Sequence, residues 1–171
     1  MTRLFTMARL ALCVGLLCWA PSAAWALGEV APDFTLRDID NQSVSLSGTK
    51  GKVVLISFWA TWCGPCQVEM PHLQKMYTEL GAKGFTVLAV SADDARTASL
   101  VKPLIKKNGY TFPVLLDKET TVVAQYNPAK TLPYSVLLDR DGKIAQVHQG
   151  YNPGDEVALK KEIEALLAAG N

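Results

Sequence analysis

The sequence predicts an α/β domain whose central mixed β-sheet is flanked by helices. Lys52–Ala60 and Phe85–Val90 are continuous apolar, β-branched runs separated by a segment of helical periodicity, which is typical of parallel strands joined by a crossover helix. An Asp141-Gly142 pair between two later apolar segments indicates an antiparallel hairpin. Gly154–Ala169 then has the period of an amphipathic helix, which we expect to cover the sheet.

The first 26 residues have the pattern of a secretory signal. Arg3 and Arg9 precede an apolar run at Leu10–Ala20, and the small-residue site Ala24-Trp25-Ala26 follows it. This run has 11 residues, whereas a membrane-spanning helix needs about 20. We therefore predict a signal peptide at residues 1–26 and one domain at residues 27–171, located in the periplasm; the alternative is an uncleaved anchor.

The charge balance excludes one class of partner. The chain has 17 basic and 16 acidic side chains, and loss of the signal would leave 15 and 16. A chain so balanced does not supply the basic stripe that phosphate backbones require, so we expect no nucleic-acid partner. Cleavage would also leave Cys63 and Cys66 as the only cysteines, in an oxidising compartment.

The first half of the domain has three clear elements. Short alternating stretches at Phe34–Leu36 and Ser43–Leu46 flank a polar turn and predict a β-hairpin. The strand at Lys52–Ala60 leads into the cysteine motif. Apolar side chains then recur every three or four residues and predict a helix from Gly64 to about Leu80, closed by Gly81.

The second half is less regular until the hairpin. A helix is predicted at Arg96–Lys107, where Pro103 must begin it or bend it. Two short segments, Pro113–Leu116 and Glu119–Tyr126, follow, and the sequence does not assign them to helix or strand. The hairpin strands are predicted at Ser135–Leu138 and Ile144–His148.

The cysteine pair is poorly suited to a structural role. A disulfide closing a four-residue loop stabilises by about 2 kcal/mol, against about 3 kcal/mol for a 15-residue loop. A structural zinc site needs four ligands, and outside the signal the chain adds only His72 and His148. Haem attachment requires histidine where Gln67 stands. We therefore expect no metal and no cofactor.

A redox role fits the position of the pair. Cys63 falls between the end of a buried strand and the start of a helix, where unpaired amides and the helix dipole favour a thiolate. Cys66 lies one turn further and should be better shielded. We expect Cys63 to be the nucleophile and Cys66 to resolve its mixed disulfide.

The WCGPC motif, the strand before it, the Asp-Gly hairpin and the last helix resemble the thioredoxin fold. From about Ala31, in the stretch APDF, to Leu167, the chain resembles the TlpA/ResA-like family of exported thiol-disulfide oxidoreductases. The resemblance implies an N-terminal β-hairpin extension and an insertion after the second core strand. It also implies reduction of protein disulfides, with apocytochrome c as the favoured substrate in cytochrome c maturation, and a membrane-embedded thiol electron donor. We expect a monomer.

The same resemblance implies a substrate-binding surface around a proline in TLPYSVLLD. Pro133 would be a cis proline facing the cysteines, and the backbone of Leu132 would pair with a bound peptide. The alternative is a trans proline at the start of a strand. Trp62, beside Cys63, is expected to form a partly exposed wall of this surface, and Trp59 to lie in the core.

Glu69 is the candidate proton carrier. On a helical wheel it lies about 20° from Leu80 and about 40° from Leu73, at the edge of the apolar stripe, so it should be partly buried. Ordinary thioredoxins have a buried aspartate where this chain has Ser57. The resemblance instead implies proton exchange between Glu69 and Cys66, helped by a pKa that burial raises. The alternative is an exposed helix glutamate.

Two rival functions remain open from the sequence. A thiol peroxidase would need threonine at Ala60 and proline at Ile56. A non-catalytic binding module stapled by its disulfide is the other rival. The direction of electron flow is predicted from Gly64 and Pro65, which add no positive charge to stabilise a thiolate. We therefore predict a reductant.

Overall fold

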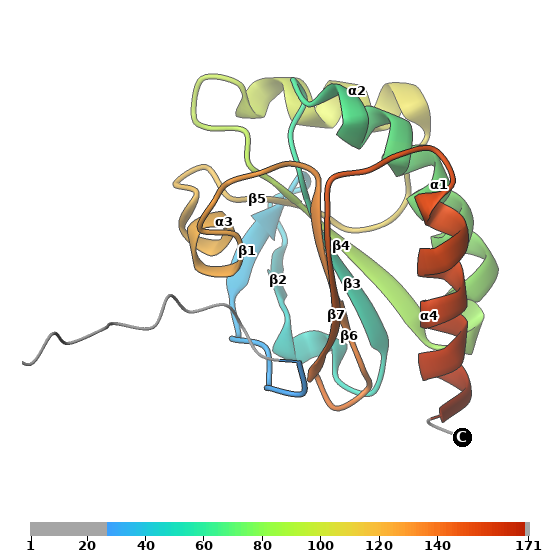
Figure 1. Ribbon diagram of the computed structural model, residues 1–171. Coiled ribbons are helices and arrows are strands. Elements are labelled where there is room, and N and C mark those ends of the chain that lie inside the picture. Colours follow the sequence, from blue (N-terminus) through green and yellow to red (C-terminus); the bar gives the residue numbers. More distant parts are fainter. Residues whose placement is uncertain (1–26, 170–171) are drawn as a thin grey trace, which may run out of the picture.

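The computed structural model describes residues 27–169, so the predicted signal peptide lies outside the described residues. A seven-stranded sheet in the order β2-β1-β5-β4-β3-β6-β7 runs through the molecule, with helices on both sides (Figure 1). The strands are β1 (Thr35–Asp38), β2 (Ser43–Ser45), β3 (Val53–Trp59), β4 (Phe85–Ser91), β5 (Val114–Leu116), β6 (Tyr134–Leu138) and β7 (Ile144–Gln149). The helices are α1 (Gly64–Leu80), α2 (Val101–Asn108), α3 (Thr121–Tyr126) and α4 (Asp155–Ala169).

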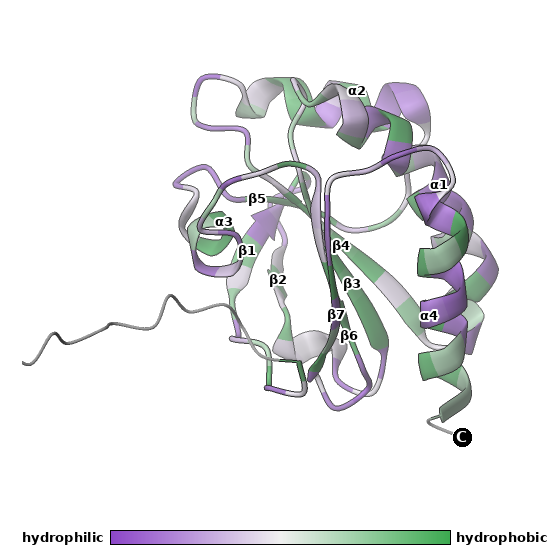
Figure 2. Ribbon diagram, in the orientation of Figure 1, coloured by the Kyte–Doolittle hydropathy of each residue, from purple (hydrophilic) through white to green (hydrophobic). Residues whose placement is uncertain are grey.

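The predicted mixed sheet is confirmed at its centre. β3 and β4 are parallel, and every residue of both strands is buried. β6 pairs with the other edge of β3 in antiparallel fashion, and β7 pairs with β6. Figure 2 shows the hydrophobic colour in β3 and β4, as expected for strands covered on both faces.

Each face of the sheet has its own hydrophobic core. One core joins Val53 and Leu55 of β3 to apolar side chains of α1, α2 and α4. The other joins Val54, Ile56 and Phe58 to α3 and to the segment before β1. This alternation follows from the two-residue side-chain period of a strand. The cysteine pair, at the start of α1, belongs to the first core.

The N-terminal hairpin and the insertion extend the sheet together. β1 and β2 are antiparallel, as predicted. The insertion after β4 consists of α2 and β5, and β5 pairs with β4 on one side and with β1 on the other. The two short segments of uncertain type are therefore β5 and α3.

The helix predicted at Arg96–Lys107 is partly wrong. α2 begins only at Val101, after a 3₁₀ turn at Ala98–Leu100. Pro103 is then the third helical residue, where a backbone N–H would have no acceptor within the helix. The side chain of Asp94 instead accepts hydrogen bonds from the N–H groups of Arg96 and Thr97, which favours a turn there.

The end of α1 is confirmed at Leu80, although Gly81 does not reverse the chain. Gly81 keeps helical dihedral angles (φ −56°) and continues into a 3₁₀ turn. Gly84, with φ +95°, adopts the left-handed conformation that leads into β4. None of the helices within residues 27–169 has the length and apolar character to cross a membrane.

Candidate active site

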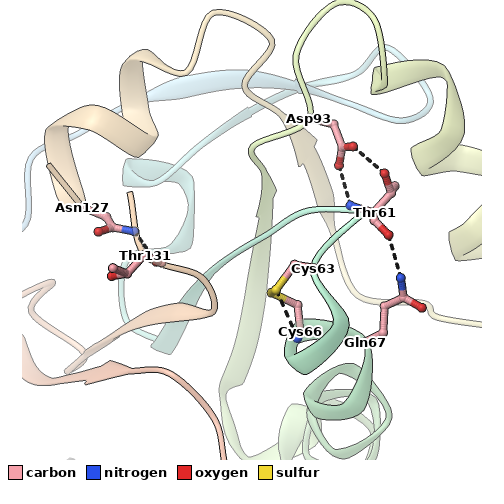
Figure 3. The surroundings of a disulfide bond; sticks show 7 residues. All are labelled: Thr61, Cys63, Cys66, Gln67, Asp93, Asn127 and Thr131. Atoms are coloured by element: carbon pink, nitrogen blue, oxygen red, sulfur yellow. Dashed lines mark hydrogen bonds between the residues drawn. A yellow bond between two sulfur atoms is a disulfide. The ribbon is translucent and has the colours of Figure 1, made fainter. Parts of the chain in front are cut away.

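The two cysteines form a disulfide at the junction between β3 and α1 (Figure 3). Cys63 is the N-cap residue of α1, and its Sγ accepts a hydrogen bond from the backbone N–H of Cys66 at 3.3 Å. Gly64 and Pro65 follow as the first helical residues, where proline is well tolerated. The sulfur of Cys63 therefore lies at the positive end of the helix dipole, as the sequence predicts.

The two sulfurs differ in their access to solvent. Cys66 has no exposed surface, and Cys63 keeps 5% of its surface exposed. Trp62, directly before Cys63, is 64% exposed, and Gly64 and Pro65 are exposed as well. Of the two cysteines, only Cys63 therefore keeps some surface in contact with solvent, next to the exposed side chain of Trp62.

Pro133 lies at the same edge of the sheet as the cysteines. The Leu132–Pro133 peptide bond is cis, as the resemblance implied. The register between β3 and β6 pairs Phe58 with Tyr134, so Pro133 lies beside the last residue of β3. Leu132 is partly buried against the core cluster that contains both cysteines.

The loop before Pro133 is fixed by polar side chains that the sequence analysis did not single out. The buried side-chain amide of Asn127 donates to the carbonyl of Thr131 at 2.7 Å (Figure 3). The side-chain amide of Gln149 donates to the Thr131 hydroxyl at 2.7 Å. The N–H of Gly150 donates to the carbonyl of Pro133 at 2.8 Å. These contacts give the candidate substrate-binding loop a defined shape.

Glu69 is more deeply buried than predicted, with 6% of its surface exposed. Its Oε2 atom has no hydrogen-bond partner within residues 27–169. The side chain lines a cavity of about 210 Å³ between α1 and α4, together with Tyr151 and Asp155. Burial, followed by the negative charge of Asp155, raises the pKa of Glu69 from 4.5 to about 7. Glu69 is thus not an exposed helix glutamate.

Four other residues that the sequence analysis mentions can be placed in the structure. Trp59 has no exposed surface. Ser57 is buried in β3 and leaves no carboxyl group at the position where thioredoxins have one. The histidines contact carboxylates of α4, His72 with Glu156 at 4.0 Å and His148 with Glu162 at 2.8 Å. No cluster of three metal-ligating side chains occurs in the described part of the chain.

The loop between β3 and Cys63 is held at Thr61 by Asp93 and Gln67, contacts that the sequence analysis did not predict. Asp93, just after β4, accepts hydrogen bonds from the N–H of Thr61 at 2.8 Å and from its hydroxyl at 2.5 Å. Gln67, in the first turn of α1, donates to the carbonyl of Thr61 at 2.6 Å. Their position at the carboxyl ends of two parallel strands was a usable signal, because functional groups concentrate at that edge.

Comparison with known proteins agrees with this geometry. The Redoxin family model matches residues 26–167. The thiol-disulfide oxidoreductase ResA of Bacillus anthracis is 37% identical over 120 residues, which cover 70% of this chain and 68% of ResA. ResA of Geobacillus kaustophilus is 34% identical over 144 residues, covering 84% and 78%.

Solved structures show the same relationship. A thiol:disulfide interchange protein from Bacteroides sp. has a TM-score of 0.69 and 32% identity, covering 84% of this chain and 91% of that protein. StoA from Bacillus subtilis has a TM-score of 0.65 and 28% identity, covering 78% and 97%. The chain therefore belongs to the Redoxin family and, within it, to the ResA-like thiol-disulfide oxidoreductases of thioredoxin fold.

Proposed function

We propose that this thiol-disulfide oxidoreductase is an exported reductant of protein disulfides, in which Cys63 attacks and Cys66 resolves. The observation that carries the proposal is the cap: Cys63 begins α1 and accepts the N–H of Cys66, while Cys66 is completely buried behind it. Amides directed at the sulfur stabilise the thiolate, which is the attacking form.

The proposed reaction starts from the reduced dithiol. The Cys63 thiolate attacks one sulfur of the substrate disulfide, and the other substrate sulfur leaves as a thiolate that takes up a proton. The Cys66 thiol then loses its proton and attacks Sγ of Cys63, releasing the second substrate thiol. Two electrons pass to the substrate, and the disulfide seen between Cys63 and Cys66 is the oxidised product.

Glu69 is proposed to take the proton from Cys66. It lies one helical turn after Cys66, on the same side of α1, and both are buried. A carboxyl group with a pKa of about 7 can accept a proton or release one at neutral pH. The cavity that Glu69 lines, between α1 and α4, gives the proton a route toward solvent.

The substrate is proposed to bind across Trp62 and the backbone of Leu132, beside Pro133. The exposure of Trp62 and the position of the cis proline at the cysteine edge support this surface. Apocytochrome c is the favoured substrate and a membrane-embedded thiol protein the favoured electron donor, both by the family resemblance. Export is supported by the signal-like pattern of the first 26 residues.

The direction of electron flow is argued from the motif. Thioredoxin has a similar motif and a potential of about −270 mV, whereas a strong oxidant such as DsbA lies at about −120 mV. Gly64 and Pro65 offer no charged side chain to stabilise the reduced form. Equilibration with glutathione should therefore give a potential near the lower value; a result near the higher one would reverse the direction.

A trapping experiment tests the proposed roles. In a Cys66→Ser variant the mixed disulfide between Cys63 and a substrate cannot be resolved. The reduced variant is mixed with oxidised apocytochrome c, or with insulin as a general protein disulfide. It should accumulate a covalent adduct that dithiothreitol releases. The matched Cys63→Ser variant should form none. Adducts formed equally by both variants, or by neither, would contradict the proposal, and rapid consumption of hydrogen peroxide would indicate a peroxidase instead.

A further inference from the structure

Asp93 is a buried acidic residue that the proposed reaction does not use. It has no exposed surface and lies two residues after the end of β4. Its hydrogen-bond donors are all uncharged groups: the N–H and hydroxyl of Thr61 and the hydroxyl of Ser91. Burial of a carboxyl group lowers the stability of the fold unless the group is hydrogen-bonded. The hydrogen bonds of Asp93 therefore show what this residue does in the structure.

Both carboxylate oxygens of Asp93 accept hydrogen bonds. Oδ2 accepts from the N–H of Thr61 and from the hydroxyl of Ser91, each at 2.8 Å, and Oδ1 accepts from the hydroxyl of Thr61 at 2.5 Å. The N–H of Asp93 itself donates to Oγ of Ser91 at 3.1 Å. The side chain of Asp93 is thereby fixed in one orientation and holds both the backbone and the side chain of Thr61.

Thr61 is held from the opposite side as well. The side-chain amide of Gln67 donates to the Thr61 carbonyl at 2.6 Å, so the N–H, hydroxyl and carbonyl of Thr61 all have partners. Two residues later, the N–H of Cys63 donates to the carbonyl of Ala60 at 3.1 Å and closes the turn. Figure 3 shows Thr61 between Asp93 and Gln67, directly before the disulfide.

We propose that Asp93 is a positioning residue for thiol-disulfide exchange, which acts through Thr61 to hold Sγ of Cys63 against the first amides of α1. The inference rests on the proposed function, since it takes Cys63 as the attacking sulfur. The influence of a helix terminus falls off within its first turn. A misplacement of about 1 Å can slow a reaction by about a hundredfold, so a loop anchored to β4 preserves both the stabilisation and the line of attack.

Two uncharged substitutions separate the contacts of Asp93 from its charge. In Asp93→Asn, the amide oxygen can accept from Thr61 N–H and Ser91, and the amide nitrogen can donate to the Thr61 hydroxyl, which is able to reverse its role. Asp93→Ala removes all of these contacts. The two variants are alike in charge, so a difference between them does not come from the charge of Asp93.

The measurements use the reduced full-length protein. One is the rate of insulin reduction at pH 7, and the other is the pH midpoint of Cys63 alkylation. We expect Asp93→Ala to react about tenfold more slowly than Asp93→Asn, with a Cys63 midpoint higher by about half a pH unit or more. Equal rates and equal midpoints for the two variants would overturn the inference.

Asp117→Ala is the matched control for the loss of a buried carboxyl group. Asp117 is also fully buried, and it accepts three hydrogen bonds from Thr121 and Val123 at the start of α3. Its replacement should lower stability but leave Cys63 reactivity unchanged; a comparable loss of reactivity would count against a specific role of Asp93.

A milder variant keeps the inference testable if Asp93→Ala does not fold. Thr61→Val removes only the hydroxyl contact and should slow insulin reduction about threefold; an unchanged rate would contradict the inference. Failure of the proposed function has a different signature, namely a Cys63 midpoint near that of an ordinary thiol in the unmodified protein. A low midpoint there, with equal Asn and Ala variants, would reject the role of Asp93 alone.

Discussion

The ionisation of Glu69 is set by the groups that surround it. The cavity around its carboxyl group is lined by Asp155 and Glu156 of α4 and by His148 and Tyr151 before that helix. Burial is the larger cause of the raised pKa, and the charge of Asp155 is the smaller one. Because Oε2 has no partner within residues 27–169, nothing there offsets the loss of hydration in the charged form.

This raised pKa makes stability depend on pH. Between pH 4.5 and about 7 the folded protein keeps a proton on Glu69 that the unfolded chain has lost, so the free energy of unfolding falls as pH rises through this window. Each pH unit corresponds to about 1.4 kcal/mol, so the full effect is on the order of 3 kcal/mol. The side chain of Gln does not ionise. The Glu69→Gln variant should therefore be more stable than the unmodified protein at pH 8, and the two should have nearly equal stability at pH 4.5.

Urea unfolding of the oxidised proteins at these two pH values checks the prediction. Glu79→Gln is the control, because Glu79 lies on the same helix with an exposed carboxylate paired with Lys160 at 2.6 Å. The hydrogen bond with Lys160 lowers the pKa of Glu79, so its loss should reduce stability slightly at pH 8. The same Glu69→Gln protein should also slow insulin reduction. A stability difference independent of pH would contradict the burial argument.

The sequence predicts the burial of some of these residues but not of others. The burial of Glu69 follows from its place at the edge of an apolar helical stripe, which is a local pattern. Asp93 and Asp94 are adjacent in a polar stretch, yet Asp93 is fully buried whereas Asp94 pairs with Arg96 at the surface. Only the contact between the ends of β3 and β4 distinguishes them, and no local pattern reports it.

At the scale of elements, α1 shows how its two ends are determined. Its start is encoded locally, since a capping cysteine, a glycine and a proline suit the first turn. The turn that follows its other end is held by a distant residue. The Arg140 guanidinium donates to the carbonyls of Gly51, Lys83 and Leu167, and it occupies the space beside Gly84.

Two alanine substitutions at this turn should therefore have opposite effects. Gly81 has helical dihedral angles and open space around it, so Gly81→Ala should stabilise the protein by about 0.4–1 kcal/mol. Gly84 has φ +95°, and a Cβ there would lie 2.8 Å from Nη1 of Arg140. Gly84→Ala should destabilise by about 1–2 kcal/mol. Urea unfolding measures both, and effects of the same sign would contradict the assignment.

Elements were predictable from sequence where their apolar pattern, continuous or periodic, is long. Apolar patterns that extend over several turns or residues occur in β3, β4, α1, the β6–β7 hairpin and α4. β5 has three residues and α3 has six, which is too short for a helical or strand period to be distinguished. Their types follow from what they pack against: β5 is paired on both sides, and α3 covers the second core.

At the scale of the whole molecule, the sheet brings three distant segments to one edge. The parallel strands β3 and β4 end there, which places Asp93 beside the loop to Cys63. The antiparallel strand β6 begins there, which adds Pro133. The thioredoxin fold could be predicted from the motif and the element order, whereas the pairing of β1 with β5 could not, because both strands are short and far apart in sequence.

The proposed function depends on the reactivity of Cys63 in the reduced protein. The most direct test is to measure alkylation by iodoacetamide across a range of pH, with the modified residue identified by mass spectrometry. An ordinary cysteine has a pKa of about 8.5. We expect Cys63 to react first, with a midpoint about one pH unit or more below that value, while Cys66 stays protected. A midpoint near 8.5, or earlier modification of Cys66, would contradict a helix-activated nucleophile at position 63.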